Sequence, residues 1–247
     1  MSKLSEAIKR TTRAEAPQIG FAPMQAKPRA TMLLAALIGA NAQPPEGADI
    51  VLVQGAATAP AANGAKQQPL RGAWLDGAAD AAQAHEGGFD FVVFNADEAP
   101  AGVLLEEDAG LVMQAPDELP DSLVQALQWL PLDALLVRWE GTLTVRRQLE
   151  LQRVSGFSRK PLFLFVANEP SARELEALRE AGVVAIVVDL TQPGSEARLA
   201  TLRTTIDGLR PRPKRSRADG FGLITSTSPL LAVAEPAHED DDDDDFE

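Results

Sequence analysis

The chain of 247 residues contains no cysteine, no tyrosine and only two histidines. The missing thiols exclude disulfides, cysteine-ligated zinc, iron–sulfur clusters and a cysteine nucleophile. His85 lies in a predicted helix and His238 near the acidic C-terminal end, so imidazole acid–base catalysis and a histidine-ligated metal are disfavoured. The six lysines also lie away from the ends of the predicted strands, which argues against Schiff-base chemistry.

The chain has fewer basic than acidic residues, 23 against 36, which gives a net charge of −13. Nine of the 36 acids lie in the last thirteen residues, so the rest of the chain carries 27 acidic against 23 basic side chains. This near balance lacks the basic excess of a nucleic-acid-binding domain. Long apolar runs are missing too: the longest, 31–40, is half of the ~20 residues that span a bilayer, and no signal peptide precedes it. These absences predict a cytoplasmic protein with no membrane contact.

Continuous apolar runs alternate with amphipathic segments, a pattern typical of parallel strands covered by helices. We predict strands at 31–37, 49–53, 72–75, 89–94, 110–114, 133–137, 161–166 and 183–190. Helices are predicted at 80–85, 99–107, 121–130, 144–154, 171–181 and 195–209. Segments 38–48 and 55–71 are too rich in proline and glycine for a long helix.

Eight strand–helix units predict an α/β fold, a compact and partly degenerate (β/α)8 barrel over residues 31–209. An open doubly wound sheet is the alternative, disfavoured because no glycine-rich first turn marks a switch point. Residues 1–30 are predicted to form an extra helix at 2–15 and a capping segment, in which 18–21 can plug the barrel. Residues 210–247 are predicted to be a flexible tail, basic over 210–217 and then acidic.

Several signals predict where helices begin, end and pack. Asp121 can cap the helix at 121–130. Ser171 opens the helix at 171–181 with a capping box, and Gly182 ends that helix. Apolar residues recur at helical spacing in two helices and are expected on packing faces: Leu123, Val124, Leu127 and Leu130 in 121–130, and Val145, Leu149 and Leu151 in 144–154.

In (β/α)8 barrels the functional site lies where the strands end, so the first polar residue after each strand is a candidate. These residues are Asn41, Gln54, Asp76, Asn95, Gln114, Arg138, Asn168 and Asp189. Arg138 can hold a carboxylate or phosphate. Asp76 and Asp189, with Glu140 or Glu169, can hold Mg²⁺ or serve as acid and base. The alternative is that every strand ends in a polar residue before its loop. The candidate catalytic residues are therefore Asp76, Arg138 and Asp189, with no reaction or cofactor identified.

Other conspicuous residues have ordinary readings. Glu106, Glu107 and Asp108 are expected at a solvated helix end rather than at a metal. Trp74 and Trp129 are expected in the core. Trp139, next to Arg138, is expected either at the barrel mouth, where it can stack on a planar ligand, or packed under a loop.

The segment Ala-Arg-Glu-Leu-Glu-Ala-Leu-Arg-Glu-Ala-Gly-Val-Val-Ala-Ile-Val-Val-Asp at 172–189 resembles the approach to strand eight in phosphate-binding barrels, including those that hold flavin mononucleotide. In that group, glycine-rich loops after strands seven and eight bind phosphate through backbone N–H groups. Here those loops begin Asn168-Glu-Pro-Ser and Asp189-Leu-Thr-Gln-Pro. The resemblance thus leaves only Gly194 and Ser195, at a helix N-terminus, to cradle an anion.

The acidic end of the chain is a candidate partner-binding segment, in which acids steer contact and an aromatic side chain fills a pocket. It resembles the acidic, aromatic-ended tail of bacterial single-stranded-DNA-binding proteins, although this chain continues to Glu247. A solubilising tail, or one that folds back on the basic segments, is the alternative. The residues expected to contact a partner are Asp240, Asp241, Asp242, Asp243, Asp244, Asp245 and Phe246.

Two functions remain open at this stage. The first is a non-catalytic or weakly catalytic barrel that serves as an interaction protein or scaffold through its acidic tail. The second is an enzyme or binding protein for an anionic small molecule or flavin, held at the strand ends by Gln54, Asn95, Gln114, Arg138, Asn168, Gly194 and Ser195. Nucleic-acid contact by residues 210–217 is a weaker third hypothesis.

Overall fold

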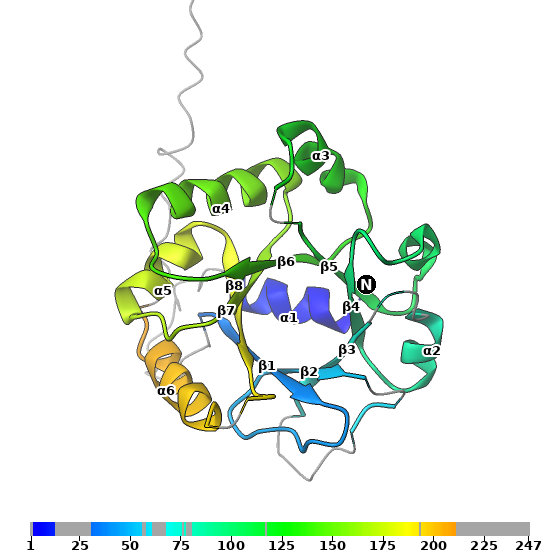
Figure 1. Ribbon diagram of the computed structural model, residues 1–247, viewed down its shortest axis with the longest axis horizontal. Helices are drawn as coiled ribbons and strands as arrows, with labels where there is room; N and C mark the ends of the chain where they lie inside the picture. Colours follow the sequence, from blue (N-terminus) through cyan, green and yellow to red (C-terminus); the bar gives the residue numbers. More distant parts are fainter. Residues whose placement is uncertain are drawn as a thin grey trace, which may run out of the picture. The chain divides into compact units, whose positions relative to one another are not determined.

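The computed structural model describes residues 2–12, 31–55, 58–60, 68–75, 77, 81–116, 118–192 and 194–210. Eight parallel strands form a closed barrel in which each strand pairs with the next and β1 with β8 (Figure 1). The (β/α)8 prediction is therefore confirmed, and the alternative of an open doubly wound sheet is wrong. The strands are β1 Leu33–Gly39, β2 Ile50–Gln54, β3 Leu70–Trp74, β4 Phe91–Asn95, β5 Gly110–Gln114, β6 Ala134–Trp139, β7 Leu162–Val166 and β8 Val183–Asp189.

The inside of the barrel is a packed apolar core. Side chains alternate along each strand, so in β1 Leu33, Ala35 and Leu37 point inward while their neighbours pack beneath the outer helices. Phe91 fills the lower interior opposite Gly72, where an added Cβ would lie 2.4 Å from the Phe91 ring. A large side chain on one strand thus requires glycine on the next. Because apolar side chains fill the interior, the polar candidate residues lie at the ends of the strands.

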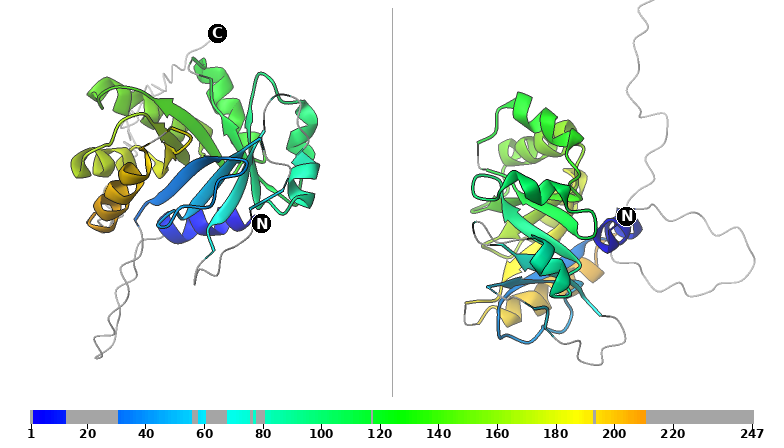
Figure 2. Two further views of the ribbon diagram at one scale, coloured as in Figure 1. Left: turned by 60° about the horizontal axis from the view of Figure 1, so that its bottom comes forward. Right: turned by 90° about the vertical axis from the view of Figure 1, so that its right-hand side faces the viewer.

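A short amphipathic helix, α1 (Lys3–Thr12), closes the N-terminal end of the barrel (Figure 2). Leu4 and Ile8 are buried against the inward-facing strand residues. Ser2 Oγ donates to Asp133 Oδ2 at 2.6 Å, and Lys3 Nζ pairs with Asp90 at 2.7 Å. The predicted N-terminal helix is confirmed and itself acts as the plug, whereas segment 18–21 lies outside the described residues.

The outer layer is well formed only in the second half of the chain. There α4 (Val145–Ser158), α5 (Ala172–Glu180) and α6 (Glu196–Asp207) follow β6, β7 and β8. The earlier connections carry short elements: α2 (Ala81–Glu86), the 3-10 helix η1 (Ala101–Leu105), α3 (Asp121–Ala126) and the 3-10 turn η2 (Leu127–Trp129). No helix occurs in 40–49, between β1 and β2, so the predicted degeneracy is confirmed there.

The helix-end signals were correct for α5 and wrong for α3. Ser171 and Glu174 form the predicted capping box, and Gly182, with a φ of +96°, follows the end of α5. Asp121 does not cap α3, because Pro120 occupies the N-cap position and the Asp121 carboxylate pairs with Arg153 on α4 instead.

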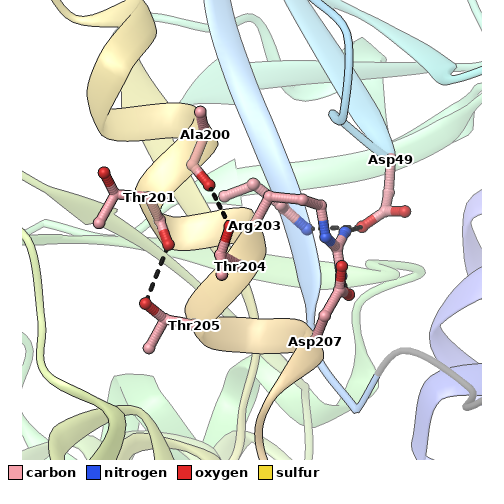
Figure 3. A network of polar contacts seen from close by, with 8 residues as sticks. Asp49, Ala200, Thr201, Arg203, Thr204, Thr205 and Asp207 are labelled. Atoms are coloured by element: carbon pink, nitrogen blue, oxygen red, sulfur yellow. Dashed lines mark hydrogen bonds and ion pairs between the residues drawn. The ribbon is translucent and has the colours of Figure 1, made fainter.

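Helix α6 is joined to β1 and to the residue before β2 by a half-buried ion-pair network (Figure 3). Arg203 on α6 donates to Asp49 Oδ2 at 2.8 Å and also pairs with Asp207, one turn further along α6. Asp49 Oδ2 in turn accepts the backbone N–H of Leu34 in β1 at 2.9 Å. Burial alone would lower the pKa of Arg203, but the hydrogen bond that Arg203 donates to Asp207 and the charge of Asp49 outweigh burial and raise the pKa.

Candidate functional site

Five of the predicted strand-end residues lie on the inward register at the open mouth of the barrel. Each is two residues after a buried inward-facing side chain, as Arg138 is after Leu136. Because side chains alternate along a strand, these five residues converge above the core. They are Gln54 on β2, Asn95 on β4, Gln114 on β5, Arg138 on β6 and Asp189 on β8.

Two aromatic side chains hold the Arg138 guanidinium at the mouth. Its Cζ lies 5.0 Å from the ring centroid of Phe165 on β7 and 6.0 Å from that of Trp74 on β3. The two rings meet edge to face, with centroids 6.5 Å apart. Arg138 and Phe165 are register partners on neighbouring strands, whereas Trp74 comes from a strand on the other side of the barrel. These cation–π contacts bring the exposed guanidinium beside both rings without neutralising its charge.

No carboxylate pairs with the Arg138 guanidinium within the described part of the chain. The backbone carbonyl of Arg138 accepts Arg147 Nη2 at 2.6 Å, which ties the end of β6 to α4. An arginine usually finds a carboxylate when it is held in place, because its five N–H groups need acceptors. Within the described part of the chain, Arg138 is therefore an exposed cation whose N–H groups are available to an anion.

The neighbouring mouth residues differ in what they offer. Asp189 Oδ1 accepts the backbone N–H of Thr191 at 2.8 Å and its hydroxyl at 2.6 Å, which shapes the loop after β8. Asn95 Oδ1 accepts the backbone N–H of Asp97 at 3.0 Å in the same manner. The side-chain amides of Gln54 and Gln114 have no hydrogen-bond partner among the residues described. These two glutamines are thus free to bind a ligand above Arg138.

The loops after β7 and β8 do not form a glycine-rich cradle. Gly194 has a φ of +85°, while the Ser195 hydroxyl is buried and donates to the Gln192 carbonyl at 2.6 Å. Arg198 Nη2, on α6, donates to the Ala167 carbonyl at 2.7 Å, which joins α6 to the loop after β7. Asn168, two residues past the end of β7, is exposed and stands apart from the five converging residues. An anion role for Asn168, Gly194 and Ser195 stays a prediction.

Among the described residues, no group of three or more His, Cys, Asp or Glu side chains could hold a metal ion. Asp76, the predicted partner of Asp189, lies outside the described part of the chain. Glu140 is exposed, and Glu169 lies 4.0 Å from Arg198. Glu106, Glu107 and Asp108 follow η1 at the surface, as expected of a solvated end. Lys160 lies at the N-terminal end of β7, where burial lowers its pKa and its Nζ donates to the Leu130 carbonyl.

The positions of the three tryptophans were predicted only in part from the sequence. Trp139 is 4% exposed and packs in the apolar layer beneath the outer helices; it does not lie at the mouth, which was one of its two expected positions. Trp74, expected in the core, is half-buried at the mouth, and neither it nor Phe165 was predicted as a site residue. Their inward register next to Arg138 was the available signal. Trp129, also expected in the core, is 82% exposed, because the chain leaves the α-helix at Ala126 and the tighter 3-10 turn rotates it outward.

A second surface lies on the outside of the barrel. Leu123, Val145 and Leu149, expected on packing faces, are exposed instead, as are Trp129 and Phe157. All five lie on α3, η2 and α4, which pack on one another, and only Leu105 among the other described residues is a large apolar side chain as exposed as these. Beside α4 runs a groove of about 760 Å³, bounded by residues 115–116 and 118–120 and by Val137. Exposed apolar side chains on adjoining helices are candidates for an interaction surface.

The groove is rimmed by charges of both signs. Arg146 and Arg147 pair with Glu150 at 3.2 and 3.1 Å, and Arg153 pairs with Asp121. Hydrogen bonds from Arg147 and Arg146 lower the pKa of the exposed Glu150, so this carboxylate is ionised at neutral pH.

None of the helices in the described ranges is long and apolar enough to cross a membrane.

Comparisons with known proteins extend to the fold alone. Neither the known protein families nor the curated protein sequences contain a match to this chain. Among solved structures, the chain is similar to tryptophan synthase from M. tuberculosis in its open form, with a TM-score of 0.54, 10% identity and coverage of 84% of this chain and 98% of that one. It is also similar to 3-keto-L-gulonate-6-phosphate decarboxylase from Vibrio cholerae, with a TM-score of 0.53, 11% identity and coverage of 73% and 99%. At such identities these structures support the resemblance to phosphate-binding barrels at the level of fold.

Proposed function

We propose that this barrel binds a small anionic ligand, a carboxylate or a phosphate ester, at its mouth. The observation that carries the proposal is the guanidinium of Arg138, fixed between Phe165 and Trp74 with no carboxylate paired to it in the described chain. A guanidinium presents parallel N–H groups that match the oxygens of a carboxylate or phosphate. The anion would meet the outward edge of Arg138, with Gln54 and Gln114 in reach of its remaining polar atoms.

The proposed role is binding rather than a defined reaction. Asp189 is already engaged by Thr191, and Asp76 lies outside the described residues, so neither is assigned as an acid or a base. Decarboxylation of a phosphorylated sugar acid is the reaction named for the V. cholerae barrel, and this chain shares with it a mouth at the strand ends. A phosphate ester therefore belongs in the first ligand panel.

The test measures thermal stability and direct binding for a panel of anions. Inorganic phosphate, a sugar phosphate, flavin mononucleotide and a dicarboxylate are compared, since a ligand at 100 times its Kd stabilises the folded protein by about 2.7 kcal/mol. Arg138→Gln should weaken binding at least about tenfold, the cost of one charge-assisted hydrogen-bond pair. Arg10→Gln serves as the control, because Arg10 is exposed on α1 at the opposite end of the barrel. Unchanged melting with every anion, or equal losses in both variants, would contradict the proposal.

An interaction role is the second candidate, favoured by the exposed apolar side chains on α3, η2 and α4. The acidic residues 240–245 and Phe246 lie outside the described residues, so their contact with a partner stays a prediction. Capture of partners by the full chain and by a chain lacking residues 235–247 tests that segment directly. An identical set of captured proteins would remove the tail from this role.

A further inference from the structure

We propose that the mouth of the barrel selects an aromatic monocarboxylate, a ligand that carries one negative charge on a flat apolar ring. This inference rests on the anion binding proposed above and names the class of anion. Three features of the mouth support it beyond the presence of Arg138: an aromatic floor, an open position on β1, and a balance of charge that suits one carboxylate.

The floor of the mouth is aromatic. Trp74 on β3 and Phe165 on β7 come from opposite sides of the barrel, and their rings meet with centroids 6.5 Å apart. Both residues pack on the interior apolar cluster and are half-buried, so each remains partly accessible from the mouth. A ligand ring that lies on this floor removes apolar surface of both partners from water and gains the favourable geometry of aromatic pairs. A small inorganic anion at Arg138 would leave this surface wet.

The position that β1 contributes to the mouth is open. Gly39 continues the inward register of Ala35 and Leu37, and an added Cβ at Gly39 would meet no atom of the described chain within 4 Å. Gly39 is the register partner of Gln54, which is in turn the register partner of Trp74. Since neighbouring strands lie about 4.8 Å apart, the open position is about 10 Å from the backbone of Trp74. The mouth therefore has free space on the β1 side of the aromatic floor, where a ring can lie.

The charges at the mouth suit one carboxylate better than a phosphate monoester. Among the inward-register residues at the eight strand ends, Arg138 is the one cation and Asp189 the one carboxylate. Two further arginines near the strand ends, Arg147 and Arg198, each donate to a backbone carbonyl and lie 4.0 Å or less from a glutamate. A phosphate monoester carries about −1.5 to −2 charges at neutral pH. Its second charge would find no further cation on the inward register and would meet the repulsion of Asp189.

Calorimetric titration of the full chain with three small anions tests the proposal. Benzoate carries one charge on a ring, acetate has the charge without the ring, and phenyl phosphate has the ring with a larger charge. Benzoate should bind at least about tenfold more tightly than acetate, because its ring buries apolar surface on the floor. Benzoate should also bind more tightly than phenyl phosphate at neutral pH. That difference should shrink at about pH 5, below the second phosphate pKa of about 6.

Three variants locate the ring. Gly39→Leu fills the open position without a clash and should weaken benzoate binding at least about tenfold. Gly156→Leu is the matched control, because Gly156 lies on α4 and an added Cβ there also meets no atom within 4 Å. Trp74→Leu keeps an apolar side chain but removes the indole, and it should weaken benzoate binding roughly two- to tenfold while leaving acetate binding unchanged. The effect of Trp74→Leu is a second reading, so the test does not depend on the folding of one variant.

Anion binding and selection of an aromatic monocarboxylate fail in different ways. The absence of binding heat with all three anions would contradict both. Acetate or phenyl phosphate that binds as tightly as benzoate at neutral pH would overturn the aromatic monocarboxylate and leave anion binding at Arg138 in place. Equal benzoate affinities of Gly39→Leu and Gly156→Leu, or an unchanged preference for benzoate over acetate in Trp74→Leu, would place the ring elsewhere and overturn the inference as well.

Discussion

At the scale of single residues, the barrel depends on pairs of side chains that are complementary in size. Gly72 and Phe91 are register partners on β3 and β4, and the space that a Cβ at position 72 would need is occupied by the phenyl ring. The second nearest group is Leu52 Cδ2 on β2, at 2.8 Å from the same point. A methyl group at this position therefore meets side chains from two neighbouring strands, and both side chains lie in the fully buried interior.

Gly72→Ala should destabilise the protein by about 1–3 kcal/mol or more, because overpacking a filled core forces side chains off their rotamers. Urea unfolding of the wild type and the variant measures the difference. Gly39→Ala is the control, since Gly39 lies on β1 with no atom within 4 Å of an added Cβ. Adding Phe91→Leu to Gly72→Ala should recover part of the loss, whereas equal stability of both glycine variants would contradict this account.

At the scale of elements, the capping signal in the sequence of α5 agrees with the contacts that α5 makes with the barrel. Ser171 accepts the Glu174 N–H, and the Glu174 carboxylate accepts the backbone N–H of Ser171 at 2.8 Å. The backbone hydrogen bond from Ser171, and then the bond from its hydroxyl, lower the pKa of Glu174. Leu175 and Leu178 are buried one and two turns into the helix. The cap therefore sets the start of α5 where its apolar face meets the barrel.

Ser171→Ala should lower the free energy of unfolding by about 1 kcal/mol, the usual cost of a lost N-cap. Glu174→Gln should also destabilise the protein at neutral pH. The pKa of Glu174 is depressed in the folded state, so its contribution is present above the ordinary glutamate pKa and is lost as pH falls through the folded value. The gap between wild type and Glu174→Gln should thus close in acid. Glu176→Gln, on the same helix, should show no such pH dependence, and a gap that is constant with pH would refute the capping account.

The elements also show why sequence reading succeeded and failed. Continuous apolar runs such as that of β8 predicted the strands because a strand buried on both faces leaves no position for polar side chains. The polar strand ends were found by the same logic. Trp74 and Phe165 were missed because their role depends on which strand lies across the barrel, and spacing along one strand does not give that. Leu149 and Trp129 were misplaced because periodicity shows an apolar stripe without showing what covers it.

At the scale of the whole molecule, closure of the barrel depends on joining its last strand to its first. β8 pairs with β1, and Arg203 on α6 reaches Asp49, which in turn binds the Leu34 N–H of β1. The ionic network therefore reinforces the last seam of the sheet rather than a local turn. Loss of the guanidinium would leave a half-buried carboxylate with only the backbone N–H as its partner.

Arg203→Met keeps the aliphatic stem over Gly47 and removes the charge, and it should destabilise the protein by about 1–3 kcal/mol. The midpoint of urea unfolding measures this. Arg173→Met, an exposed site on α5, should stay within about 0.5 kcal/mol of the wild type. If the two variants unfold at the same urea concentration, the seam does not depend on Arg203.

The placement of the tryptophans gives the protein three built-in optical reporters. Trp74 faces the mouth, Trp139 lies in the dry layer beneath the outer helices, and Trp129 stands in solvent on the α3–α4 surface. With no tyrosine in the chain, near-ultraviolet emission comes from these indoles above a weak phenylalanine background. Variants that keep one indole each would report anion binding, loss of the core and changes at the α3–α4 surface as separate signals from one unlabelled molecule.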